Sequence, residues 1–110
     1  MYVAMNKFQV QPGKEEAFER VWRERETHLQ EVPGFVQFAL LRADDGEFIS
    51  HSTWESRDAF VAWTESEQFA RGHRQGSPMG EILAGPPQLR TYEAAIVETP
   101  EERVVGASPE

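Results

Sequence analysis

The pattern of apolar and polar residues marks four extended segments in this chain of 110 residues. In the first segment, Asn6 interrupts the more apolar of the two faces, between Ala4 and Phe8. The second segment is almost wholly apolar, which predicts a strand that is covered on both faces. Asp44-Asp45-Gly46 predicts a hairpin turn into the third. The four predicted strands are residues 2–11, 35–42, 48–54 and 88–97.

A long helix is predicted over residues 14–31, where apolar residues recur with a period near 3.6. Pro12-Gly13 turns the chain into this helix. Its apolar stripe includes Trp22, and Arg25 lies in the middle of that stripe. A buried arginine usually extends its charged end to solvent or pairs with a carboxylate of the protein. The alternative is that Arg25 binds an anionic group of a ligand.

The pattern of residues 56–75 predicts two short helices in tandem and not one continuous helix. Ser56 is the predicted N-cap of the first, which carries Trp63, and Ser66 is the predicted N-cap of the second. The second helix places Phe69 and His73 four residues apart, on one face. A break near Ser66 lets Trp63 and His73 face a common space.

The order of these elements, β-α-β-β-(αα)-β, predicts an α+β ferredoxin-like fold with a four-stranded antiparallel sheet. Its helices are expected to cover one face of the sheet. We expect the other face to pack against a second copy in a homodimer, giving a dimeric α+β barrel. Residues 1–98 are the predicted domain, and residues 99–110, which are polar and acidic, a disordered tail.

Composition narrows the function classes. A net charge of −8 argues against nucleic acid as a partner. The chain has no cysteine, which excludes disulfides and thiolate metal sites. Its first residues lack the pattern of a signal peptide, and no apolar run approaches the roughly 18 residues of a membrane span. We therefore expect a soluble, cytoplasmic protein without membrane association.

The unusual residues are expected to converge between the sheet and the helices. Asn6, Trp22, Arg25, Trp63 and His73 would line a mostly apolar cavity. Asn6 has a simpler interpretation, in which its amide bonds the backbone. One histidine cannot hold zinc alone, because zinc sites use three or four protein ligands. One histidine in an apolar pocket can hold haem iron, whose other ligands come from the porphyrin.

Three segments, MYVAMNKF, AFVAWTES and QFARGHR, resemble those of the IsdG-type haem-degrading monooxygenases of the antibiotic biosynthesis monooxygenase superfamily. The resemblance runs from about residue 2 to residue 97. That family uses an asparagine on the first strand, a tryptophan on the second helical segment and a histidine ten residues later. The matching positions here are Asn6, Trp63 and His73. Relatives more often have phenylalanine where this chain has Trp22, which puts the position of the haem and the product isomer in doubt.

The resemblance implies that haem is both cofactor and substrate, consumed with O2 and electrons from an external reductant to give iron and a bilin-type product. It assigns His73 as the axial ligand of the haem iron. Asn6 would donate a hydrogen bond on the open side of the ring, and Trp63 would buckle the porphyrin. We assign Trp22, Arg25 and Phe69 to haem binding, with Arg25 pairing with a propionate.

Three other interpretations stay open from the sequence. The first is a cofactor-free monooxygenase of the same superfamily that oxidises a quinol or polycyclic phenol. The second is a haem carrier or sensor that never degrades its ligand. In the third, a dimeric ferredoxin-like domain, the tryptophan and histidine residues merely fill a core.

Overall fold

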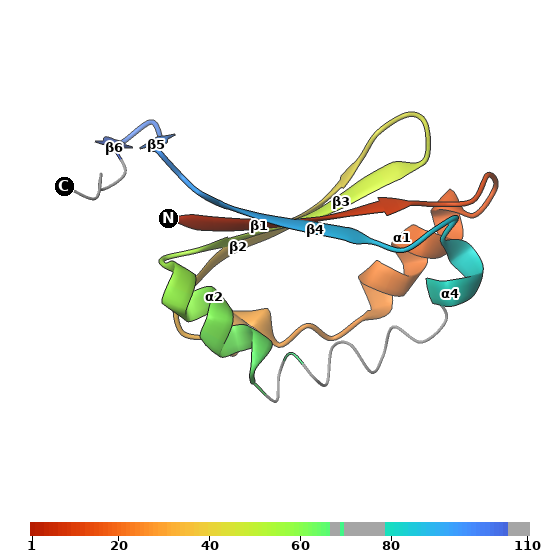
Figure 1. Cartoon of the computed structure of the whole chain (residues 1–110), viewed down its shortest axis with the longest axis horizontal. Coiled ribbons are helices and arrows are strands. Elements are labelled where there is room, and N and C mark those ends of the chain that lie inside the picture. The colour runs from red at the N-terminus through yellow and green to blue at the C-terminus, as the bar shows by residue number, and fades with distance from the viewer. Residues whose placement is uncertain (67–68, 70–78, 106–110) are drawn as a thin grey trace.

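The computed structural model describes residues 1–66, 69 and 79–105 of the chain. Its main sheet is antiparallel, with the strand order β2-β3-β1-β4. Helices α1, α2 and α4 all lie on the same face of this sheet (Figure 1). The predicted α+β ferredoxin-like fold is therefore confirmed. The sheet consists of β1 (Tyr2–Gln9), β2 (Phe35–Arg42), β3 (Glu47–Trp54) and β4 (Gln88–Glu93), and the helices are α1 (Glu15–Glu24), α2 (Arg57–Thr64) and α4 (Met79–Ile82).

Strand register determines which side chains share the helix-covered face. Asn6 of β1 lies opposite Ser50 of β3 and opposite Leu89 of β4. Tyr2 and Phe8, on the same face of β1, lie opposite Trp54 and Phe48. Because side chains alternate along a strand, these residues all point toward the helices.

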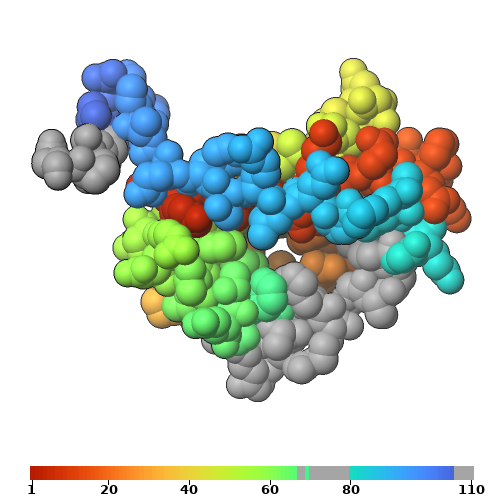
Figure 2. Space-filling view, viewed as in Figure 1, coloured from red at the N-terminus to blue at the C-terminus, as the bar shows by residue number. Residues whose placement is uncertain are grey.

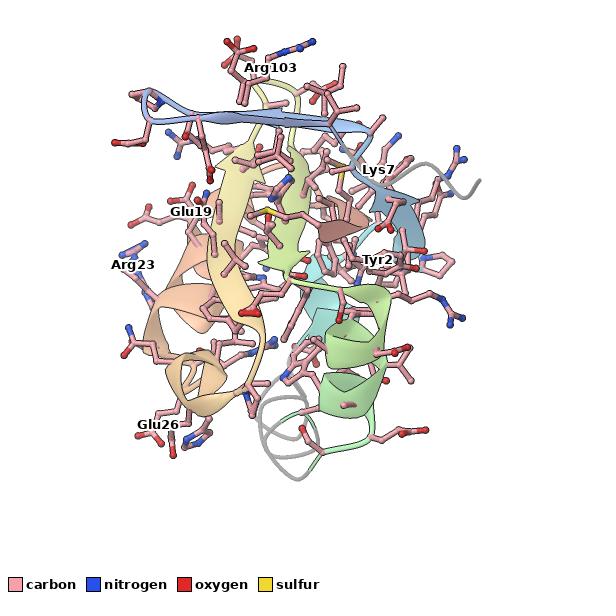
Figure 3. All side chains as sticks on the ribbon, turned by 90° about the vertical axis from the view of Figure 1, so that its left-hand side faces the viewer. Tyr2, Lys7, Glu19, Arg23, Glu26 and Arg103 are labelled. Carbon is pink, nitrogen blue, oxygen red and sulfur yellow. The ribbon has the colours of Figure 1, made fainter. Side chains whose placement is uncertain are left out.

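The core lies at one end of the sheet, beneath α1. Phe18 of α1 and Phe48 of β3 are fully buried, with ring centroids 4.7 Å apart. Phe8, Val10 and Ile82 of α4 complete this cluster. Three charged residues of this region, Glu19, Arg23 and Glu26, project outward (Figure 3).

Helix α1 ends at Glu24, seven residues before the predicted end at Glu31. Arg25 is already extended (φ −76°, ψ 133°), His28 adopts a left-handed conformation (φ 59°), and a single 3-10 turn, η1 (Leu29–Glu31), follows. Between Trp22 and Leu29 no apolar residue is available to hold a further helical turn against the sheet. The prediction of one continuous helix was wrong for this reason.

Helix α2 begins as predicted, because the Ser56 hydroxyl accepts a hydrogen bond from the Ala59 amide at 3.1 Å. The helix ends at Thr64, and the Ser66 hydroxyl accepts from the Phe69 amide at 3.1 Å. These contacts confirm the break near Ser66. Gly34 allows α2 to lie close to the start of β2, since a Cβ at Gly34 would come within 2.5 Å of the Ala59 Cβ.

The C-terminal segment differs from the sequence prediction of a disordered tail from residue 99. Strand β4 ends at Glu93, and a second hairpin, β5 (Ile96–Glu98) with β6 (Arg103–Val105), projects from the end of the sheet (Figure 1). The Thr99 hydroxyl accepts a hydrogen bond from the Glu102 amide and stabilises its turn. Within the described part of the chain, no helix is long and apolar enough to cross a membrane.

Candidate functional site

A cavity lies between the sheet and the helices because the middle of the sheet carries small side chains. Ala4, Ser50 and Ser52 surround Asn6 on the helix-covered face. Large aromatic side chains fill the space on both sides of this patch. Phe8, Phe18 and Phe48 pack at one end, and Tyr2, Trp54 and Phe60 at the other. The patch between them leaves a hollow above the sheet.

This hollow has a volume of about 330 Å³. Five of the predicted site residues line it: Asn6, Trp22, Arg25, Trp63 and Phe69. Figure 2 shows a hollow beneath β4, between α2 and α4, with residues of the N-terminal helical segment at its back. The sixth predicted residue, His73, lies outside the residues that the structure describes.

Trp22 and Arg25 form one side of the cavity. The Trp22 ring stacks on Phe38 of β2, with centroids 5.5 Å apart and an interplanar angle of 24°. The guanidinium carbon of Arg25 lies 4.2 Å from the centroid of the Trp22 ring, a cation–π contact. Arg25 makes this contact from an extended backbone position just beyond the end of α1.

Both of these residues present buried donors. Arg25 Nε and Trp22 Nε1 have no hydrogen-bond partner among the described residues, and no acidic side chain there forms an ion pair with Arg25. Burial lowers the pKa of the Arg25 guanidinium from its usual value, because desolvation disfavours the charged form. An arginine nevertheless remains protonated at neutral pH. This corner of the cavity therefore offers a positive charge and two N–H groups to an anion.

Trp63 forms the opposite side of the cavity, at the C-terminal end of α2. The fully buried Trp54 backs it, with ring centroids 5.0 Å apart and an interplanar angle of 32°. Phe69 meets the Trp63 ring edge-on, at 4.8 Å and 86°. Because of this packing, the indole of Trp63 can contact a flat ligand without rotating away from it.

The side-chain amide of Asn6 lies on the side of the cavity that the sheet forms, which we call the floor. Its side-chain oxygen Oδ1 is buried and has no hydrogen-bond partner among the described residues. The interpretation in which its amide oxygen bonds the backbone therefore finds no support in the structure. A buried amide oxygen left in this state costs roughly 1–3 kcal/mol of stability, which a hydrogen-bond donor, from a ligand or a bound water molecule, would recover.

The sequence did not single out several other residues that line the cavity. These residues are Thr27, Phe38, Ser50, Ser52, Phe60 and Leu89. The alternation of β3 contains the signal for the two serines, since residues 50 and 52 share the face of Asn6 once β3 is paired with β1. His51 lies on the other face, opposite Met5.

The described residues contain no group of three His, Cys, Asp or Glu side chains that could hold a metal ion. The cavity instead combines aromatic walls, a neutral polar floor and one cationic corner. Such a site suits a large flat ligand that carries an anionic substituent. The fold and site together define a small α+β protein with a binding cavity between its sheet and helices.

The chain belongs to the antibiotic biosynthesis monooxygenase family, whose model matches residues 1–75. A heme oxygenase (mycobilin-producing) of Mycobacterium tuberculosis is 34% identical over 76 residues, which cover 66% of this chain and 72% of the relative. The predicted family is therefore confirmed.

Solved structures support the fold. SnoaB from Streptomyces nogalater, a cofactor-independent oxygenase, superposes with a TM-score of 0.67 at 22% identity, covering 92% of this chain and 97% of SnoaB. Rv0793 from Mycobacterium tuberculosis gives a TM-score of 0.66 at 18% identity, covering 90% of this chain and 97% of the other. At these identities the likeness establishes the fold alone.

Replacing Arg25 by methionine should stabilise the ligand-free protein, because it removes a partly desolvated charge that has no carboxylate partner among the described residues. We expect the free energy of unfolding, measured in urea, to rise by about 1 kcal/mol. A gain of this size is usual when a partly buried charge is replaced by an apolar side chain of similar volume. Arg20→Met, at an exposed position of α1, serves as the control and should change it by less than about 0.5 kcal/mol. A loss of stability in Arg25→Met would show that the cation–π contact with Trp22 outweighs the cost of desolvating the charge.

Proposed function

We propose that this protein is a haem-degrading monooxygenase that binds haem in the cavity between its sheet and helices. The observation that carries the proposal is the pairing of an apolar, aromatic cavity with a buried cationic corner, in a family member that is 34% identical to a heme oxygenase. Haem has the matching chemistry, since it is a large flat apolar ring with two acidic propionates. Bound haem would supply the iron that activates O2 against the ring itself.

Each predicted site residue would have its own role in binding haem or in the reaction. Arg25, supported by Trp22, would bind a propionate and fix the orientation of the ring. His73 would hold the haem iron through its imidazole, as the family resemblance implies. The Asn6 amide would hydrogen-bond an oxygen atom on the floor side of the ring. Trp63, backed by Trp54, would press on the ring and bend it. Phe69 would pack beside Trp63 and help to seal the cavity.

Adding haemin to the purified protein tests this function. We expect a Soret band of bound haem that bleaches when ascorbate or a reductase is added under air, with release of iron and a bilin-type product. A Soret band that survives reductant and air would identify a haem carrier instead. The absence of a Soret complex would contradict the proposal and favour a cofactor-free enzyme acting on a quinol or polycyclic phenol.

The proposal includes a cytoplasmic homodimer in which two sheets pack together. One face of the sheet is not covered by any helix of the described chain (Figure 1), and its apolar side chains include Leu41 and Tyr92, which are 46% and 41% exposed. Val3, Met5 and Ile49 lie on the same face and are only half-buried. A second copy placed on this face would remove these side chains from water.

Replacing Val3 by glutamate should dissociate this dimer, because it would bury a carboxylate from each copy on this face, where the uncharged Thr53 and Tyr92 lie opposite Val3. Sedimentation velocity at micromolar concentration would measure the change. Ala43→Glu, which adds the same charge at the exposed end of β2, should leave the dimer intact. A wild-type monomer, or a dimer that survives Val3→Glu, would contradict this arrangement.

A further inference from the structure

Ser52 carries a buried hydroxyl at the cavity floor, and this hydroxyl accepts a hydrogen bond but donates none among the described residues. It is 8% exposed and lines the cavity beside Ala4 and Asn6. Its oxygen lies 3.0 Å from Nε1 of Trp54. An indole N–H can only donate, so Ser52 Oγ is the acceptor in this bond.

The hydroxyl hydrogen of Ser52 must therefore point elsewhere. A hydroxyl that accepts from one side directs its own hydrogen away from that donor. No acceptor for this hydrogen occurs among the hydrogen bonds of the described residues. Since Ser52 lines the cavity, the hydrogen is available to a ligand there. Trp54 cannot rotate to release it, because its ring is fully buried among Phe35, Phe60 and Trp63.

Ser52 also stands in a defined relation to Asn6. In the antiparallel pair of β1 and β3, Ser52 lies opposite Ala4, and Asn6 is two residues further along β1. Side chains in this diagonal relation on one face lie about 7–8 Å apart. A small group held between Asn6 and Ser52 can thus be reached by both, directly or through one water molecule. The methyl group of Ala4 leaves this space open.

We propose that Ser52 is a second hydrogen-bond donor beside Asn6, directed by Trp54 at an oxygen atom or small anion on the floor side of the ligand. This inference rests on the proposed function, in which the floor side of haem is the side left open for O2. A neutral donor fixed in advance stabilises negative charge that develops on such an oxygen without having to reorient during the reaction. Ser52 would therefore contact the reacting atoms, and Trp54 would act as a positioning residue.

Azide binding to the ferric haem complex tests the proposal without relying on turnover. Azide is a small anion that binds haem iron on its open side, where the Ser52 hydroxyl would donate to it. We expect Ser52→Ala to weaken azide about tenfold, the factor typical of a hydrogen bond to a charged acceptor. The CO stretching frequency of the ferrous carbonyl complex should rise in the same variant, because a donor near the CO oxygen lowers it.

Ser52→Ala leaves the Trp54 N–H buried without its acceptor, which can impair folding. The double variant Ser52→Ala/Trp54→Phe removes both partners and avoids this problem. It should show the same loss of azide affinity as the single variant. Ser52→Thr keeps the hydroxyl and should restore most of the affinity. Thr53→Ala removes a hydroxyl from the neighbouring residue on the opposite face of β3 and should leave azide binding unchanged.

The outcomes separate this inference from the function on which it rests. A normal Soret complex in the double variant, with unchanged azide affinity and CO frequency, would overturn the role of Ser52 and leave the haem proposal intact. Absence of a Soret complex in the wild type would overturn both. Weakened azide binding in the single and double variants, with recovery in Ser52→Thr, would support the role of Ser52.

Discussion

Replacing His73 by alanine should abolish the optical signature of histidine-bound haem. The resemblance to haem-degrading monooxygenases implies a haem-iron ligand at this position, and the part of the chain that the structure describes brings no imidazole to the cavity. Loss of a direct metal ligand should weaken haem binding by more than the roughly 10–100-fold that an outer-shell partner contributes. Titration of haemin, followed at the Soret band, measures both changes.

His51→Ala is the matched control for this variant. It removes an imidazole from the other face of the sheet, where His51 lies opposite Met5 and away from the cavity. We expect its haem spectrum to match the wild type. Added imidazole should restore a nitrogen-bound spectrum to His73→Ala, because it can occupy the vacated position. A histidine-type spectrum in His73→Ala before imidazole is added would remove this residue from the site.

Replacing Asn6 by alanine should separate binding from chemistry. The apolar walls and Arg25 remain, so haem affinity should stay within about threefold of the wild type. Turnover should fall about 10²–10³-fold, the effect of removing one donor from a preorganised site. Single-turnover bleaching of the Soret band under air, with ascorbate as reductant, measures the rate.

Unfolding cannot explain such a loss, because Asn6→Ala removes a buried amide oxygen that lacks a partner among the described residues, and should leave stability equal or higher. Lys7→Ala, on the opposite face of β1, is the control and should keep the wild-type rate. If Asn6→Ala retained full turnover, Asn6 would have no part in the reaction.

The sequence predicts much of the sheet because turn residues bound its strands clearly and the first strand alternates with a period of two. The second strand was predicted with the bounds that the structure has, and the third to within one residue. The break at Ser66 was also predicted, since a serine cap is a local signal. Pairing these strands then brings Asn6 beneath Trp22 and Trp63.

The errors arose where tertiary contacts override local pattern. Arg25 was placed on a helical stripe, whereas it lies just beyond the helix and stacks on Trp22. The second hairpin was missed because residues 99–105 are polar and rich in charge, and only the pairing of β5 with β6 orders them. The serines of the floor were overlooked because their importance depends on the register between β1 and β3.

The cavity concentrates features that reduce stability. Asn6 and Arg25 both carry a buried polar atom without a partner among the described residues, and Ser52 leaves a hydroxyl hydrogen unused. Local conflicts of this kind are expected at functional sites, because a ligand resolves them. Their grouping around one apolar space indicates that the space is built to hold a partially polar molecule.

A crystal structure of the protein grown with haemin would test most directly whether this cavity is the haem site. We expect the porphyrin between the sheet and the helices, with a propionate at Arg25 and the Asn6 amide facing the floor side of the ring. Haem bound only on the outer surface, with Asn6, Trp22 and Trp63 unchanged around an empty cavity, would contradict the proposed function.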